Sequence, residues 1–217
     1  MSAGSAQLWA GLGNPGAQHR WDRHNVGFMV VEAVARRHGF AEWRDGKGWR
    51  AARGEIGGVA VFLLEPLTYM NLSGGAVQSA AEKFRLKTER ILVIHDELDL
   101  SLGRVKVKTG GGDAGHNGLR SITAVTGADY RRLRVGIGRD GGDARDYVLS
   151  SFSATERAEM LTPLLDAIAE NVPYLVKNDE ENDNRFLSAM DVAMSPLRGG
   201  ATATATVTGK APKKETD

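Results

Sequence analysis

The segment Ile94–Ser121, IHDELDLSLGRVKVKTGGGDAGHNGLRS, combines acids, bases, glycines, two histidines and an asparagine between two apolar segments. Its first residue closes the apolar run Ile91–Ile94, which is typical of a short buried strand. His95, Asp96 and Glu97 therefore follow at the carboxyl end of a strand, the edge at which open α/β sheets bind ligands. The segment predicts an α/β fold with a functional site at this edge.

Outward from this segment, short apolar runs alternate with longer runs of helical spacing. Strands are predicted at residues 8–12, 53–56, 59–64, 91–94, 105–108 and 130–138, with a hairpin turn at Gly57-Gly58. Helices are predicted at 26–38, 75–85, 117–126, 155–176 and 185–194, with Ser73 as a cap of the second and an acidic link at 179–183. Residues 1–198 are predicted to form one α/β domain. Residues 199–217 are predicted to be a disordered, low-complexity tail.

The composition excludes several classes of protein. The chain has 217 residues, a formal net charge of +1 and no cysteine, which excludes disulfides, thiol catalysis and the commonest structural zinc sites. The near-neutral charge confines any binding of nucleic acid to a local patch. No apolar run approaches the roughly 20 residues that span a bilayer, and the N-terminal sequence lacks the layout of a signal peptide. We therefore expect a soluble, cytoplasmic protein that does not enter a membrane.

Gly11–Gly16, GLGNPG, matches the dinucleotide-binding fingerprint G-x-G-x-x-G and follows a predicted strand. That fingerprint requires a helix to begin at its third glycine, where the helix dipole meets a pyrophosphate. Here Pro15 and a polar stretch come before any helical spacing, and no acidic residue ends a following strand. A strand-end turn that directs Asn14 into a cleft fits the sequence better, and a purely structural turn is the plainer alternative.

His24 is the leading candidate for a catalytic base. It is predicted to lie at the start of a helix, with Asp22 at the N-cap position, where the positive end of the helix dipole favours a neutral imidazole. Asp96 at its strand end could orient the ring through one nitrogen and leave the other for a water molecule. The chain has no G-x-S-x-G nucleophile elbow, so the set favours attack by water on an activated carbonyl. Three side-chain amides in separate loops could place the substrate or bind the oxyanion, although any one of them is more often a turn residue: Asn14, Asn71 and Asn117.

A metal site is a competing interpretation of the same histidines. His24, His95, Asp96 and His116 offer ligand atoms, but His95 and Asp96 are neighbours in a strand, and their side chains leave on opposite faces. No H-x-x-x-H or H-E-x-x-H spacing is present. We therefore predict that the site holds no metal.

A local basic patch is predicted beside the same strand. Between Gly103 and Arg145 the chain has nine basic residues against four acids. Three bases alternate with valine and would share one face of a strand: Arg104, Lys106 and Lys108. Three more occur in the next predicted strand: Arg131, Arg132 and Arg134. The pattern favours contacts with phosphate, and a solvated sheet face is the alternative.

Five motifs, in order and spacing, are similar to those of the bacterial peptidyl-tRNA hydrolase family: GLGNPG, RHNVGF, EPLTYMNLSG, HDELDLSLGRVKVKTGGGDAGHNGLRSI and YRRLRVGIGR. The resemblance covers about Leu8 to Met194. It implies a single α/β domain with a twisted, mostly parallel (mixed) sheet flanked by helices, and a monomer without metal or cofactor. It also implies hydrolysis of the ester that joins a peptide to the 3′ ribose of tRNA, which recycles tRNA from stalled translation.

The resemblance also implies roles for individual residues. His24 is similar to the catalytic base of the family, and Asp96 to the acid that orients it. Six positions are similar to those that bind the peptide, the tRNA 3′ end and the attacking water: Asn14, Tyr69, Met70, Asn71, His116 and Asn117. Four positions would contact the tRNA acceptor stem and its 5′ phosphate: His19, Lys106, Lys108 and Arg134.

The chain departs from the family pattern in places. His19 stands where relatives usually have tyrosine, and Asp22 where they have threonine, which adds a negative charge near His24. Asp140 replaces a usual proline and Ala114 a usual glycine. Two other functions remain open from sequence: a noncatalytic RNA-binding relative of the same fold, and a dinucleotide-dependent oxidoreductase that rests on GLGNPG alone.

Overall fold

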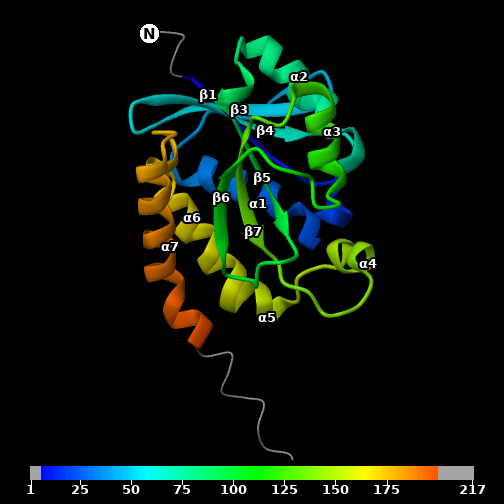
Figure 1. Cartoon of the computed structure of the whole chain (residues 1–217), viewed down its shortest axis with the longest axis vertical. Helices are drawn as coiled ribbons and strands as arrows, with labels where there is room; N and C mark the ends of the chain where they lie inside the picture. The colour runs from blue at the N-terminus through cyan, green and yellow to red at the C-terminus, as the bar shows by residue number, and fades with distance from the viewer. Residues whose placement is uncertain (1–5, 200–217) are drawn as a thin grey trace, which may run out of the picture.

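The apolar runs come together as one seven-stranded sheet in the computed structural model, which describes residues 6–199 (Figure 1). Residues 200–217 of the predicted tail lie outside this part of the chain. From one edge to the other, the strands are β2 (Arg44–Gly46), β3 (Trp49–Ile56), β4 (Val59–Pro66), β1 (Gln7–Gly11), β5 (Ile91–Glu97), β7 (Arg131–Gly136) and β6 (Val105–Thr109).

Parallel pairing is confined to the four central strands. β1 pairs in parallel with β4 and β5, and β5 with β7. The outer strands pair antiparallel, β2 with β3, β3 with β4 and β6 with β7. The expected mixed sheet is confirmed. Because parallel strands share a direction, the carboxyl ends of β4, β1, β5 and β7 meet at one edge, where ligands bind in such sheets.

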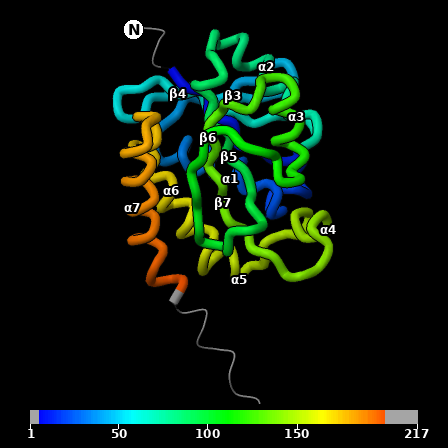
Figure 2. Tube along the Cα trace, viewed as in Figure 1, coloured from blue at the N-terminus to red at the C-terminus, as the bar shows by residue number. Residues whose placement is uncertain are grey.

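Helices cover both faces of the sheet (Figure 2). One face packs against α1 (Val26–Arg37), α6 (Thr162–Leu175) and α7 (Glu180–Gly199). The other packs against α2 (Ser73–Phe84) and α3 (Asn117–Thr126). Alternation along β1 fills both cores, because Leu8 and Trp9 point to opposite faces. The shorter elements are η1 (Ala17–His19), η2 (Arg23–Asn25), η3 (Met70–Leu72), η4 (Thr88–Arg90), α4 (Ala144–Leu149), α5 (Ala154–Glu156) and the π-turn η5 (Arg157–Leu161).

The helix predicted at residues 117–126 is found at those residues, whereas three other local predictions were wrong. Ser73 lies inside α2 rather than capping it, and its Oγ donates to the Met70 carbonyl at 2.9 Å. Residues 180–183 of the predicted acidic link belong to the first turn of α7, where acidic side chains stabilise a helix N-terminus, and Asp179 just before it accepts from the Asn182 backbone N–H. Arg104 precedes β6, and its guanidinium lies 3.6 Å from Asp191 on α7 instead of joining the basic face.

Close approach of α1 to the sheet places the start of this helix at the carboxyl edge. A Cβ atom on Gly27 would collide with the backbone of Leu12 and with the carbonyl oxygen of Ile94. A Cβ atom on Gly11 would meet the backbone of Gly27 in the same way. Only glycine fits at both positions. The residues just before α1 are therefore held beside the end of β5.

Candidate active site

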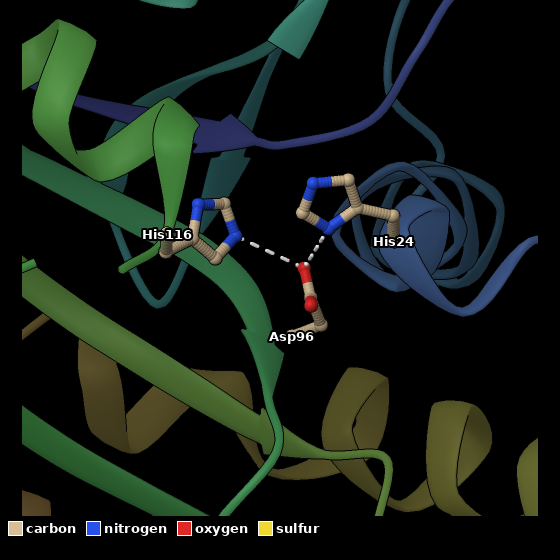
Figure 3. Close-up of side chains that lie close together, drawn as sticks. All are labelled: His24, Asp96 and His116. Carbon is tan, nitrogen blue, oxygen red and sulfur yellow. Dashed lines mark hydrogen bonds and ion pairs between the residues drawn. The ribbon is translucent and has the colours of Figure 1, made fainter. Parts of the chain in front are cut away.

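His24 and Asp96 form a buried hydrogen-bonded pair (Figure 3). His24 lies in η2, the turn that leads into α1, and Asp96 lies near the end of β5. Although the two residues are 72 positions apart in sequence, His24 Nδ1 is 2.8 Å from Asp96 Oδ1. A carboxylate oxygen can only accept, so Nδ1 carries the proton. The lone pair of the neutral ring is therefore on Nε2.

His116 is a second donor to the same carboxylate oxygen. It caps α3, and its Nδ1 accepts from the backbone N–H groups of Gly118 (3.1 Å) and Leu119 (3.4 Å). Its proton must then be on Nε2, which donates to Asp96 Oδ1 at 3.0 Å. The sequence predicted His116 as a substrate-binding residue. That role stays a prediction, and the structure adds a direct bond to Asp96.

The charges of this cluster favour ionised Asp96. Burial raises the pKa of Asp96, but the His24 and His116 rings outweigh burial and hold it well below its usual range. Burial lowers the pKa of His24, and Asp96, with a smaller contribution from Asp22, more than reverses this. The net pKa of His24 is therefore raised, and the lowering expected from the helix dipole was wrong because the Asp96 carboxylate dominates. A raised pKa strengthens His24 as a base once the ring is neutral.

Asn14 is held in place through its Oδ1 and its backbone, and no residue among 6–199 bonds its amide N–H groups. Its Oδ1 accepts from the backbone N–H of Met70 at 2.9 Å. Asn25 clamps the backbone of Asn14, accepting from its N–H and donating to its carbonyl, both at 2.9 Å. The Asn14 NH₂ group remains available for a ligand. Sequence reasoning missed Asn25, which immediately follows His24 in the RHN motif and gave no other signal.

A cleft of about 820 Å³ lies at this edge of the sheet. One side is formed by the start of α3 and the loop before it, and the other by α4. Tyr69 is two-thirds exposed at its rim, and Met70 is buried beneath it. Every predicted catalytic and substrate-binding residue lines this cleft: Asn14, His24, Tyr69, Met70, Asn71, Asp96, His116 and Asn117.

The predicted tRNA-binding residues lie away from that lining. Lys106 and Lys108 are exposed on β6, opposite Arg134 and Arg132 of β7. Arg134 forms an ion pair with Glu97 at 2.8 Å. Within the described part of the chain, the exposed cations of this strand pair are thus its two lysines.

The other two arginines of β7 are buried and form hydrogen bonds and an ion pair within the fold. Arg132 is buried and donates to the carbonyls of Gly111 and Gly112, both at 2.7 Å. Arg131 is buried on the opposite face, where it pairs with Asp183 and donates to the Leu175 carbonyl at 2.6 Å. The basic patch counted in the sequence is therefore smaller at the surface.

His19 and Asp22 form a second histidine–aspartate pair close to the first. His19 Nδ1 is 2.7 Å from Asp22 Oδ2, and Asp22 Oδ1 accepts from Ser151 Oγ at 3.0 Å. Asp22 occupies the N-cap position of η2, but its side chain makes no capping bond. These bonds anchor the loop that carries His24 to the segment that follows α4.

Three of the four residues considered as metal ligands do converge. The ligand atoms of His24, Asp96 and His116 lie within 4.8 Å of one another. The fold creates this cluster from distant segments, so a search for local ligand spacing could not find it. Both ring nitrogens that face Asp96 carry protons that a cation would have to displace. The absence of metal from the functional site stays a prediction.

The helix that a dinucleotide-binding fingerprint requires at Gly16 is not found there. Gly16 is followed by the short turn η1, and α1 begins only at Val26. Gly13 instead packs against the ring of Phe28. GLGNPG is a turn at the end of β1 that presents Asn14 to the cleft, which confirms the predicted turn.

The family model described as peptidyl-tRNA hydrolase matches residues 8–193. The chain belongs to the peptidyl-tRNA hydrolase family. Similar relatives include peptidyl-tRNA hydrolases of Agrobacterium fabrum (52% identical over 176 residues, 80% of this chain and 74% of the relative) and of Rhodopseudomonas palustris strain BisB18 (47% over 190 residues, 87% and 92%). The sequence resemblance is confirmed.

Solved peptidyl-tRNA hydrolases share the fold. The Acinetobacter baumannii structure at 1.00 Å has a TM-score of 0.76 at 37% identity and covers 88% of this chain and 95% of its own. A complex of a peptidyl-tRNA hydrolase with N-propanol has a TM-score of 0.78 at 36% identity, covering 88% and 96%. In the described residues of this family member, no helix is long and apolar enough to cross a membrane.

Proposed function

We propose that the chain hydrolyses the ester bond of peptidyl-tRNA, an N-acylated aminoacyl-tRNA, with His24 as general base for an attacking water. One observation carries the proposal: Asp96 binds the Nδ1–H of His24, which leaves the Nε2 lone pair of a cleft-lining ring free. The membership of a hydrolase family supports the same chemistry.

The reaction needs two proton transfers at one atom. His24 Nε2 takes a proton from water as its oxygen attacks the ester carbonyl, and Asp96 stabilises the imidazolium that forms. The tetrahedral intermediate then collapses, the bond to the ribose 3′ oxygen breaks, and the same proton passes from Nε2 to that oxygen. Free tRNA and a peptide with a new carboxyl group are released. No cofactor takes part in this sequence.

Amide groups of the cleft would bind the substrate and the developing oxyanion. The Asn14 NH₂ group supports this role, because its orientation is fixed by the bond from Met70 to Oδ1. Asn71 and Asn117 are exposed in the cleft and would hold the 3′ end and the water. Tyr69 at the rim offers an aromatic face to the peptide.

The tRNA would lie across β6. Lys106 and Lys108 are exposed two residues apart on β6, whereas Arg134 is paired with Glu97, so the two lysines are the better candidates for contacts with backbone phosphates. His19 would add a contact at the far side of the His24 loop. We further propose that residues 1–198 act as one monomeric, cytoplasmic domain that recycles tRNA from stalled translation.

His24→Ala tests the chemistry directly. We expect it to lower turnover of N-acylated aminoacyl-tRNA by about 10²–10⁴-fold while tRNA affinity stays near that of wild type. His38→Gln is the matched control, since the His38 side chain bonds the Ala169 carbonyl, away from the cleft. Wild-type turnover by the His24 variant would contradict the mechanism.

Substrate discrimination tests the activity class. The wild-type protein, with EDTA present, should cleave N-acylated aminoacyl-tRNA and leave free aminoacyl-tRNA intact. Loss of cleavage with EDTA would point to a metal, and tRNA binding without any cleavage would favour a noncatalytic RNA-binding protein.

A further inference from the structure

His95 is a buried histidine beside the site that the proposed mechanism does not use. It precedes Asp96 in β5 and is 2% exposed. Its Nδ1 lies 2.7 Å from the backbone carbonyl oxygen of Asp96. Its ring meets that of His116 edge-on, with centroids 5.1 Å apart. Its Nε2 is buried and has no hydrogen-bond partner among residues 6–199.

We propose that His95 is a positioning residue, which fixes the backbone of Asp96 so that the Asp96 carboxylate can accept N–H groups from both His24 and His116. The proposal rests on the hydrolysis proposed above. Although His95 is among the residues that line the cleft, it is only 2% exposed, so we infer that it acts through Asp96 and not on the substrate.

The end of β1 explains why the Asp96 carbonyl needs such a donor. β1 pairs with β5 up to Gly11, opposite Ile94, and the N–H of Leu12 donates to the Ile94 carbonyl at 2.9 Å. Alternate carbonyls of a strand point to the same side, so the Asp96 carbonyl also faces β1, beyond its last paired residue. A buried carbonyl there requires a partner from outside the sheet. The His95 side chain supplies it.

The hydrogen bond to the Asp96 carbonyl also determines the tautomer of the His95 ring. A carbonyl oxygen only accepts, so Nδ1 carries the proton and Nε2 the lone pair. Burial, with a smaller contribution from the neighbouring His116, lowers the pKa of His95 to about 3. The ring is therefore neutral at physiological pH. A neutral ring beside Asp96 holds its backbone without competing with His24 for the negative charge.

Two substitutions of His95 distinguish the role of its Nδ1–H donor from the role of its aromatic ring. Phenylalanine keeps an aromatic ring at this position and removes both ring nitrogens. It relieves the unpartnered Nε2 but leaves the buried Asp96 carbonyl without its donor. Because these two effects oppose each other, the stability of His95→Phe should stay close to that of wild type. Asparagine loses the ring but places an amide N–H near the position of Nδ1. If the His95 ring serves only to pack, His95→Phe should have the higher kcat of the two variants. If the N–H donor positions Asp96, His95→Asn should have the higher kcat.

We expect His95→Phe to lower kcat about tenfold, since misplacing catalytic groups by 1 Å can cost 10²-fold. KM should stay close to that of wild type, and the acid limb of kcat/KM against pH should move to lower pH, because a displaced Asp96 raises the pKa of His24 less. His95→Asn should keep kcat within about threefold of wild type and restore the pH profile. Thermal unfolding of each variant checks the fold.

Either of two results would overturn the inference: His95→Phe with wild-type kcat and pH profile, or His95→Asn as slow as His95→Phe. If His95→Phe is unstable, the asparagine variant decides alone, through a near-wild-type or a tenfold lower kcat. These failures would leave the proposed hydrolysis intact, whereas wild-type protein that does not cleave peptidyl-tRNA would remove both.

Discussion

Replacing Asp96 by asparagine separates the two effects that this carboxylate has on His24, orientation and charge. Asp96 Oδ1 accepts N–H groups from His24 (2.8 Å) and His116 (3.0 Å). Asparagine has the same shape, and its oxygen can accept both N–H groups only if its NH₂ lies at the position of Oδ2. His116 favours that orientation, because its Nδ1 is occupied by the α3 backbone and its Nε2 can only donate. D96N should keep the correct His24 tautomer and lose only the charge.

The expected size of the effect follows from one hydrogen bond. A bond to a charged acceptor contributes about 1.5–3 kcal/mol and a neutral one about 0.5–1.5 kcal/mol. The difference, about 1–1.5 kcal/mol, corresponds to about tenfold in kcat. An asparagine that turned and donated to His24 would impose the wrong tautomer, which costs about 10⁴-fold in a serine protease triad. The two orientations therefore predict rates about a thousandfold apart.

Single-turnover cleavage of N-acylated aminoacyl-tRNA over a range of pH distinguishes them. We expect D96N to lower the rate about tenfold and to move the acid limb to lower pH, because loss of the carboxylate lowers the pKa of His24. Adding His116→Leu to D96N should let the new side-chain amide turn and donate to His24, so the loss of cleavage rate should approach 10⁴-fold. A loss of that size in D96N alone would refute the orienting role of His116. An unmoved acid limb would refute the electrostatic role of Asp96.

Three further substitutions test other parts of the molecule. Asp22→Asn removes a buried charge that helps to raise the pKa of His24, so the acid limb of kcat/KM should move to lower pH. Burial raises the pKa of Glu65 to about 7 from a usual 4.5, so the free energy of unfolding should fall by about 3 kcal/mol as pH rises through this interval; urea unfolding at about pH 5 and pH 8 should show this fall in wild type and not in E65Q. K106A/K108A should weaken tRNA binding and reduce its salt slope by about two.

Matched controls exist for the last two substitutions. Glu32 shares Arg50 with Glu65, at 3.0 Å, and its side chain is 45% exposed. Its charge is the smallest of the causes that shift the pKa of Glu65 and burial is the largest, so E32Q should keep most of the pH dependence of unfolding. Lys83 and Lys87 are exposed near the amino end of β5, at the opposite end of the sheet from the cleft. A double alanine variant of these lysines that weakened tRNA binding equally would contradict a specific role for β6.

The ends of the predicted elements, read from hydrophobic periodicity, were enough to locate the site in the fold. The apolar run Ile91–Ile94 identified β5, which placed Asp96 at its carboxyl end. The helical spacing after Val26 placed His24 at the start of α1. Carboxyl ends of parallel strands and the helices that follow them meet at one edge. The pairing of His24 with Asp96 was therefore accessible without coordinates.

The partners of charged side chains were not predictable in the same way. Alternation in β7 shows which face a residue occupies, but not which acceptor lies there. Arg134 pairs with Glu97, and Arg132 ties down a glycine loop, so two cations counted towards a phosphate-binding face are already satisfied. Likewise, the tautomer of His116 depends on backbone N–H groups at the start of α3. Such partners come from distant segments whose approach is set by packing.

Unequal strand lengths explain why the site forms at this point of the sheet. β1 ends at Gly11 opposite Ile94, whereas β5 continues to Glu97. The space beside the last residues of β5 is open to the segments that follow β1, and these carry Asn14 and His24. The same mismatch removes the β1 partner from the Asp96 carbonyl. An early strand end thus creates room for the base and, at the same time, a backbone group that a side chain must hold in place.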